Sequence, residues 1–149
     1  MVKRLCLAAA LVAVASPAFA DPLEFSSEPG PALNIARTLM GQERGTPLTD
    51  DETVSIALVD LDGDDTRDII AFADASHFCG SGGCIPRIYR LERDTGKWSE
   101  LPIETSVFLN GEPAMWSTEG KGPTGWLNLV FSNSDMRIVL AWNGSAYSN

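Results

Sequence analysis

The sequence predicts a mainly β fold (α+β): a small antiparallel β domain of about six to eight short strands, with hairpins like those of a propeller blade and one short N-terminal helix. Apolar residues alternate with a period of two through most of the chain after residue 53, which is the pattern of half-buried strands. Glycine, proline, asparagine and aspartate separate these runs at short intervals, as in antiparallel hairpins.

Residues 1–20 have the pattern of a cleaved signal peptide. Lys3 and Arg4 precede an apolar run that ends at Ala15, and an A-x-A cleavage site follows. The run is too short to span a bilayer, although a retained N-terminal anchor is the alternative. We expect one β-rich domain over 21–149, periplasmic or secreted, with no membrane insertion after cleavage, because 149 residues are too few for two ordinary domains.

The acidic composition excludes two classes of partner. Removal of Lys3 and Arg4 with the signal peptide reduces the 11 basic side chains to nine against 20 acidic ones, so the net charge of −9 becomes −11. A surface so negative repels phosphate backbones and anionic lipids, and we expect no nucleic-acid partner. The charge either attracts divalent cations or a basic protein, or serves solubility alone.

One amphipathic helix is expected near the N-terminus. Pro31 follows Gly30 and suits the first helical turn, where its missing N–H is harmless. Apolar residues then recur at helical spacing, and Gly41 is placed to end the helix. The polar segment 43–52 reads as a connecting loop. The apolar stripe consists of Leu33, Ile35, Ala36, Leu39 and Met40.

Strands account for most of the remaining chain. Asp94 to Gly96 and the dipeptide Asn110-Gly111 are strong turn signals, and 118–125 reads as a glycine-rich loop. The expected strands are 54–59, 69–73, 85–91, 97–101, 103–109, 114–117, 126–131 and 136–142. Four tryptophans lie in or beside these strands, and core packing is favoured over carbohydrate stacking for Trp98, Trp116, Trp126 and Trp142.

Five aspartates fall within nine residues between the first two strands. Asp60, Asp62, Asp64 and Asp68 occupy loop positions 1, 3, 5 and 9, and the carbonyl of Thr66 stands at position 7. Gly63 supplies the backbone freedom that a tight coil requires. Odd-numbered spacing lets carboxylates converge from one side of such a coil, and hard oxygen ligands suit Ca²⁺. These five ligand positions therefore predict a structural Ca²⁺ site.

The segment Asp60 to Asp68 resembles the calcium loop of FG-GAP and VCBS-type repeats, whose pattern is D-x-[DN]-G-D-G-x-x-D followed by an apolar strand. Asp65 stands where that family usually has glycine, which implies weaker metal affinity because aspartate adopts positive φ at some cost. The resemblance covers about twenty residues and implies one such unit rather than a propeller. The alternative is a metal-free polar turn, although five aspartates repel one another and Arg67 alone cannot neutralise them.

Cys79 and Cys84 are separated by four residues, three of them glycine, and in an exported chain such a pair predicts a disulfide. The segment also resembles the Cys-Gly-x-Gly-Gly-Cys stretch of short bacterial exported proteins that carry an aspartate loop. A zinc half-site or a thiol nucleophile with His77 is the alternative, but zinc needs four N or S ligands and a second cysteine would trap the thiol.

The sequence therefore supports three functions in order. The first is a non-catalytic exported binding module with a Ca²⁺ loop and a disulfide clasp, recognising another exported or cell-envelope protein. The second is a periplasmic inhibitor or immunity protein that blocks a basic cell-wall hydrolase. The third is a small carboxylate-based hydrolase, which ranks last because no Ser-His-Asp set, P-loop or GxGxxG motif is recognisable.

Overall fold

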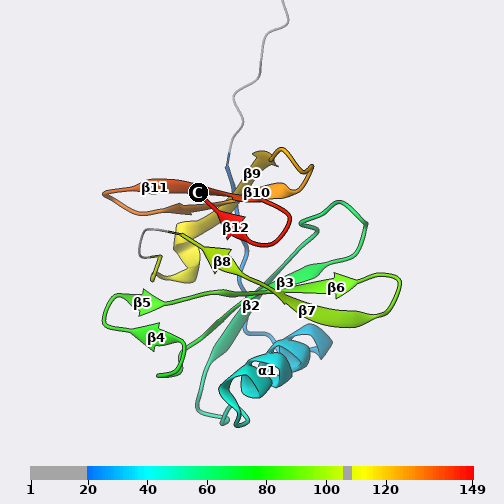
Figure 1. The fold of residues 1–149 in the computed structure, drawn as a ribbon. Helices are drawn as coiled ribbons and strands as arrows, with labels where there is room; N and C mark the ends of the chain where they lie inside the picture. Colours follow the sequence, from blue (N-terminus) through cyan, green and yellow to red (C-terminus); the bar gives the residue numbers. More distant parts are fainter. Residues whose placement is uncertain (1–19, 106–108) are drawn as a thin grey trace, which may run out of the picture.

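Two large β-sheets, a two-stranded ribbon, one α-helix and one short 3₁₀ helix make up the described fold (Figure 1). The computed structural model describes residues 20–105 and 109–149, so the predicted signal peptide and residues 106–108 lie outside it, apart from Ala20. A four-stranded sheet has the order β2 (Val54–Val59), β3 (Asp68–Ala73), β6 (Arg87–Glu92), β7 (Lys97–Leu101). A six-stranded sheet has the order β1 (Asp21–Pro22), β9 (Trp116–Lys121), β10 (Leu127–Ser132), β11 (Arg137–Trp142), β12 (Tyr147–Ser148), β8 (Ile103–Glu104).

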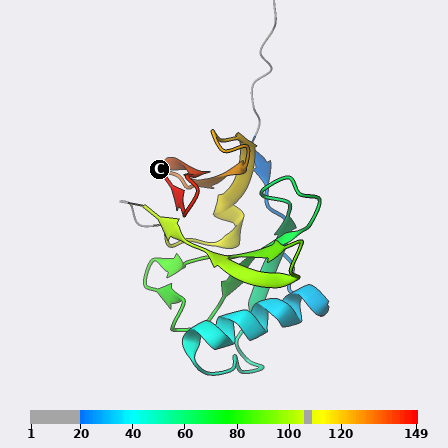
Figure 2. The same cartoon turned by 45° about the vertical axis from the view of Figure 1, so that its right-hand side comes forward.

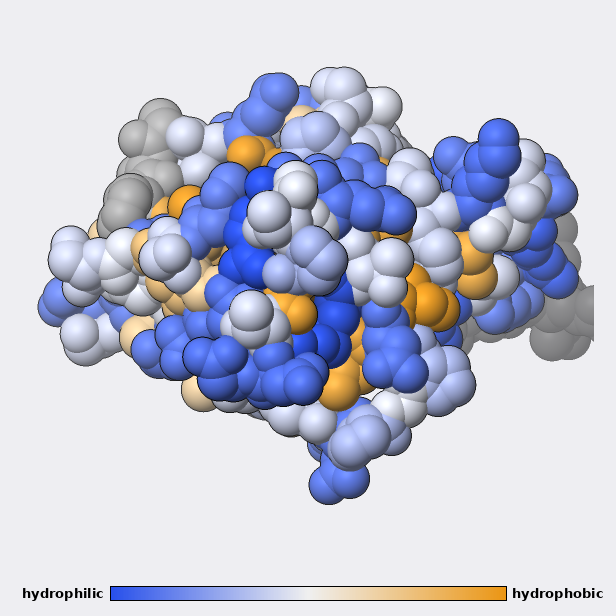
Figure 3. All heavy atoms as spheres, turned by 90° about the horizontal axis from the view of Figure 1, so that it is seen from below, coloured by the Kyte–Doolittle hydropathy of each residue, from blue (hydrophilic) through white to orange (hydrophobic). Residues whose placement is uncertain are grey.

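The elements stack in three layers. Helix α1 (Pro31–Arg44) covers one face of the four-stranded sheet, and the six-stranded sheet covers the other face (Figures 1 and 2). Strand β3 is therefore buried on both faces: Ile69, Ala71 and Ala73 pack toward the helix, and Ile70 and Phe72 pack toward the second sheet. The outer surface seen from the helix side is mainly hydrophilic, because α1 turns its apolar stripe inward (Figure 3).

The predicted fold class is confirmed. Seven of the twelve strands in the described residues are five or six residues long, and the other five are two-residue strands. All neighbouring strands pair antiparallel except β12 and β8, which are parallel. The buried Trp116 lies between the sheets, and the other three tryptophans pack at the rims of the two cores.

The chain crosses between the two sheets at Pro102. Strand β7 ends at Leu101 in the four-stranded sheet, and β8 begins at Ile103 in the six-stranded sheet. The carbonyl of Pro102 accepts a hydrogen bond of 2.8 Å from the backbone N–H of Tyr147, whose side chain is fully buried. A single residue thus joins the sheets on this side.

The predicted end of the helix at Gly41 is wrong. Helix α1 continues to Arg44, and Gly45 ends it in the left-handed conformation at φ 80°. Gly41 is buried, and a Cβ at this position would lie 3.2 Å from Cα of Pro47. Its lack of a side chain therefore permits close approach of the following loop, which sequence periodicity cannot reveal.

The segment after residue 109 also differs from expectation. Gly111 forms no hairpin turn: it exchanges backbone hydrogen bonds of 3.2 and 3.3 Å with Cys84, and the 3₁₀ helix η1 (Pro113–Met115) follows. The region 118–125, predicted as a loop, is strand up to Lys121, because β9 pairs with β10. Of the predicted strand 103–109, the described residues contain only β8.

Glu52 ties the loop after α1 to the helix end. Its carboxylate pairs with Arg44 at 2.5 Å and accepts a hydrogen bond of 2.7 Å from the N–H of Thr49. The hydrogen bond from Arg44 lowers the pKa of Glu52 from 4.5 to about 2, with the Thr49 amide as the next cause. This interaction stabilises the ionised form.

Acid titration is expected to reveal the contribution of Glu52. Because its pKa is lowered on folding, the stabilisation is complete above about pH 4.5 and is lost as the pH falls toward 2. The difference in unfolding free energy between the wild type and Glu52→Gln should shrink over this window in urea denaturation. Glu104→Gln, at an exposed site, is the control, and a difference for Glu52→Gln that is constant from pH 6 to pH 2 would contradict the assignment.

Candidate metal centre

The β2–β3 hairpin positions the aspartate loop. The register pairs Val59 with Asp68, so residues 60–67 leave the sheet together as one loop. Each carboxylate of Asp60, Asp62 and Asp64 places one oxygen within 4.8 Å of the others. Three oxygens at such separations could be bridged by one cation with metal–oxygen distances of about 2.3–2.6 Å. The predicted convergence is therefore present for three of the four aspartates.

Hydrogen bonds within the loop fix its coil. Oδ1 of Asp60 accepts from the N–H of Gly63 at 2.7 Å and of Asp64 at 3.2 Å, and Oδ2 accepts from Asp65 at 3.1 Å. Asp65 has φ 66° and is the one non-glycine residue with positive φ in the described chain. Asp65 thus adopts a left-handed conformation that glycine would reach with less strain.

Thr66 contacts Asp64 through its side chain and its amide. The N–H of Thr66 donates to Oδ1 of Asp64 at 2.8 Å, and the hydroxyl donates to the same oxygen. The hydroxyl contact, followed by the amide contact, lowers the pKa of Asp64. Asp64 is therefore held in the ionised form that a metal ligand requires.

Asp68 lies apart from the three converging carboxylates. It is fully buried, and its two oxygens accept hydrogen bonds of 3.1 Å each from the backbone N–H groups of Leu61 and Leu91. The pKa of Asp68 is raised to about 6, mainly by burial; the charges of Asp62 and Asp64 add to this rise, and the two amides oppose it. Asp68 joins the loop to β6, a role that its loop position does not reveal.

Basic side chains that the sequence analysis missed surround the loop. Arg90 on β6 pairs with Asp62, and Nη1 of Arg93 donates to the backbone carbonyl of Asp64 at 2.6 Å. A Cβ on Gly63 would lie 3.3 Å from Nζ of Lys121, so this ammonium is also adjacent.

Arg67, the loop's own cation, donates instead to the carbonyl of Leu58. For Arg90, the alternation of β6, which places it and Tyr89 on opposite faces, is the sequence signal that could have suggested its contact.

The loop can hold a cation, but the present ion pair between Asp62 and Arg90 would have to change when the cation binds. Hard carboxylate oxygens, backbone amides and a fixed coil are the parts of an oxygen-ligand site. No thiol and no imidazole lies in the loop, which disfavours soft transition metals. Asp60, Asp62 and Asp64 would hold the metal. Thr66 hydrogen-bonds Asp64, and Asp68 holds the backbone of the loop through the amide of Leu61. The carbonyl of Thr66 and the carboxylate of Asp68 stay predicted ligands.

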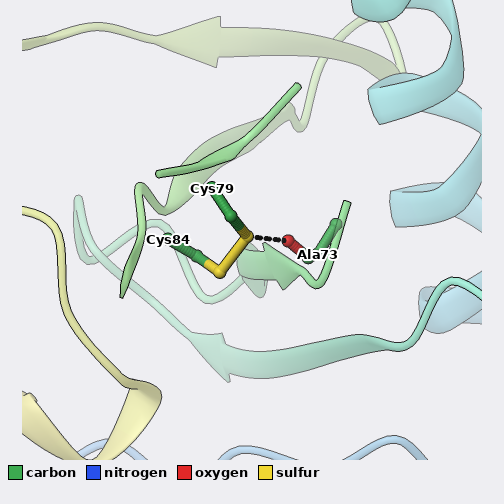
Figure 4. The surroundings of a disulfide bond; sticks show 3 residues. All are labelled: Ala73, Cys79 and Cys84. Atoms are coloured by element: carbon green, nitrogen blue, oxygen red, sulfur yellow. Dashed lines mark hydrogen bonds between the residues drawn. A yellow bond between two sulfur atoms is a disulfide. The ribbon is translucent and has the colours of Figure 1, made fainter. Parts of the chain in front are cut away.

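The disulfide between Cys79 and Cys84 is confirmed (Figure 4). It closes the ribbon of β4 (Cys79–Gly80) and β5 (Gly83–Cys84), and Sγ of Cys79 lies 3.0 Å from the carbonyl oxygen of Ala73 at the end of β3. With both sulfurs bonded to each other, the group formed by Asp74 and these cysteines offers no thiolate to a metal. The zinc interpretation therefore loses its thiolate ligands, and the nucleophile interpretation loses its free thiol.

The ribbon and the aspartate loop flank the same strand. The loop precedes Asp68 at the start of β3, and the ribbon contacts Ala73 at its end. His77 packs edge-on against Phe78 at 4.8 Å rather than lying in the loop. The two features that the sequence singled out thus secure opposite ends of the central buried strand.

Comparisons with protein-family models, with curated proteins and with solved structures find no match to this chain. Within residues 20–105 and 109–149, no helix has the length and apolar character needed to cross a membrane. The site must therefore be interpreted from its own geometry.

Proposed function

We propose that this protein is a non-catalytic exported binding module in which the β2–β3 loop holds a structural Ca²⁺ ion. The convergence of Asp60, Asp62 and Asp64 within 4.8 Å carries the proposal. Ca²⁺ is favoured over Mg²⁺ because Ca²⁺ accepts irregular, flexible oxygen geometry, whereas Mg²⁺ demands a near-ideal octahedron. Because the aspartate oxygens also hold backbone amides of the loop, a bound ion would stiffen the hairpin rather than activate a substrate.

Export and the partner class follow from independent features. The basic and apolar pattern of residues 1–20 and the Cys79–Cys84 disulfide both support an oxidising compartment outside the cytoplasm. The net charge, −9 for the full sequence and −11 without residues 1–20, favours a partner with a basic surface, and we propose another exported or cell-envelope protein. The loop would keep the neighbouring β6–β7 hairpin in a fixed position for recognition.

Calorimetric titration of the processed, oxidised protein with Ca²⁺ is expected to give one site with a dissociation constant of about 10⁻⁴ to 10⁻³ M, the range of extracellular modules. At about 10 mM Ca²⁺ the free energy of unfolding should rise by about 2 kcal/mol. Asp60→Asn and Asp64→Asn should each abolish the heat, whereas Asp135→Asn, in the exposed turn between β10 and β11, should retain it.

Asp65→Gly provides a test in the opposite direction. Glycine adopts the φ of 66° without strain, so this variant should have a higher free energy of unfolding than the wild type and should still bind Ca²⁺. If the wild type gives neither heat nor a Ca²⁺-dependent rise in melting temperature, the metal is removed from the proposed function. Capture of periplasmic proteins with and without EGTA then asks whether the partner requires the loaded loop.

A further inference from the structure

The guanidinium of Arg90, on β6, places a positive charge against the aspartate loop. Its Nε and Nη2 atoms both contact Oδ2 of Asp62, at 2.7 and 2.6 Å. The Asp62 side chain is 6% exposed and that of Arg90 is 33% exposed, so the carboxylate of this ion pair is shielded and the guanidinium is partly open to solvent. The other oxygen of Asp62 accepts a hydrogen bond of 3.2 Å from the N–H of Asp64, which leaves little unused acceptor capacity on this carboxylate.

The same guanidinium contacts the six-stranded sheet. Its Cζ lies 5.2 Å from the ring centroid of Trp126, which precedes β10. Trp126 stacks on Trp142 of β11, with centroids 4.6 Å apart and planes at 15°. The backbone N–H of Leu127 also donates to the carbonyl of Leu61 in the loop, at 2.8 Å. We call the contacts of Asp62, Arg90 and Trp126 the Arg90 bridge.

We propose that the Arg90 bridge regulates the aspartate loop: Arg90 acts as an internal counter-cation that competes with Ca²⁺ for Asp62, and metal binding displaces its guanidinium from Asp62 and shifts it relative to Trp126. This inference rests on the proposed Ca²⁺ function. It assigns Arg90 as the residue that sets the affinity, and Trp126 as the residue that reports occupancy to the second sheet.

Electrostatics favours competition over joint binding. A divalent ion bound by Asp60, Asp62 and Asp64 would lie within a few ångströms of the guanidinium, and like charges at that distance repel, even where the guanidinium is partly open to solvent. Binding Ca²⁺ with Arg90 in place would also require Asp62 to serve an amide, a guanidinium and the metal at once. Movement of the guanidinium releases one oxygen and removes the repulsion.

The two ends of the bridge predict two separate signals. Removing the guanidinium should strengthen Ca²⁺ binding, because the competitor is lost. Removing the indole at position 126 should eliminate the part of the fluorescence change that arises when a cation leaves the ring face. Arg67 offers a matched control, since it is the loop's own arginine but donates to the backbone carbonyl of Leu58 and to no loop carboxylate among the described contacts.

The test is Ca²⁺ titration of the full, oxidised protein by calorimetry and by tryptophan fluorescence. Arg90→Gln should bind Ca²⁺ about tenfold more tightly than the wild type, and Arg67→Gln should change the affinity by less than about twofold. The wild type should show a Ca²⁺-dependent change in tryptophan emission that Trp126→Phe and Arg90→Gln both lack. Arg90→Lys, which keeps the charge without the planar fork, should bind with intermediate affinity and serves if Arg90→Gln does not fold in EGTA.

The outcomes separate this inference from the proposed function. If the wild type and Arg90→Gln bind Ca²⁺ equally, or if Arg67→Gln gains as much as Arg90→Gln, the competition is overturned while the Ca²⁺ function stands. If Arg90→Gln binds Ca²⁺ and the wild type does not, the competition is supported, and Arg90 excludes Ca²⁺ from the wild-type loop. If neither binds, both proposals fall.

Discussion

Replacing Trp116 by alanine is expected to lower the free energy of unfolding by about 4 kcal/mol, within the range for truncating a buried aromatic side chain. Trp116 is 1% exposed and packs between the sheets, with ring centroids 5.4 Å from Phe131 and 6.4 Å from Phe72. Alanine would leave a cavity where both sheets meet. Urea denaturation followed by far-UV circular dichroism measures the loss, because this signal does not depend on the deleted indole.

Two further variants separate cavity formation from loss of a tryptophan. Trp98→Ala removes the same type of side chain from a partly buried position beside α1 and should cost about 2 kcal/mol. Trp116→Phe should cost less than truncation, because Nε1 of Trp116 is buried with no hydrogen-bond partner in the described part of the chain. If Trp116→Ala is no more damaging than Trp98→Ala, Trp116 does not stabilise the contact between the sheets.

Introducing a single methyl group at Gly83 is expected to cost about 3 kcal/mol, from backbone strain and a steric clash together. Gly83 has φ 112°, and a Cβ there would lie 3.0 Å from both N and Cα of Gly111. Backbone atoms cannot move aside as a flexible side chain can, so the ribbon would separate from the segment that pairs with Cys84. Urea denaturation of Gly83→Ala, with the disulfide verified by thiol titration, measures the cost.

Gly80→Ala is the matched control in the same ribbon. Gly80 has no positive φ, and its Cβ would meet only the side-chain amide of Asn110 at 3.4 Å, an ordinary contact. This variant should stay within about 0.5 kcal/mol of the wild type. Equal losses at positions 80 and 83 would show that the ribbon tolerates no side chain at all, and that the approach of Gly111 has no special cost.

Features encoded by neighbouring residues could be predicted from the sequence. The alternating apolar pattern defined β2, the continuous apolar run after Asp68 defined β3, and the aspartates between them predicted a coiled loop. The Cys79–Cys84 pair was recognisable because a ring closed by glycines needs no distant partner. In each case the interactions that form the structure lie within a few residues of one another.

Features that depend on distant partners could not be predicted. Arg90 reaches Asp62 across 28 residues, and Asp68 accepts a hydrogen bond from the N–H of Leu91 across 23 residues. The parallel pairing of β8 with β12 and the close contact between Gly83 and Gly111 likewise depend on how the sheets stack. Spacing within a loop identifies which side chains can converge, but the packing of other strands decides which of them do.

The passage of the chain at Pro102 has a consequence for cooperativity. Because β7 and β8 are separated by one residue and belong to different sheets, neither sheet can melt at this edge without pulling on the other. The loop carbonyl of Leu61 and the backbone of Leu127 couple the sheets a second time. The described fold should therefore unfold in one all-or-none transition, with no populated state in which one sheet persists alone.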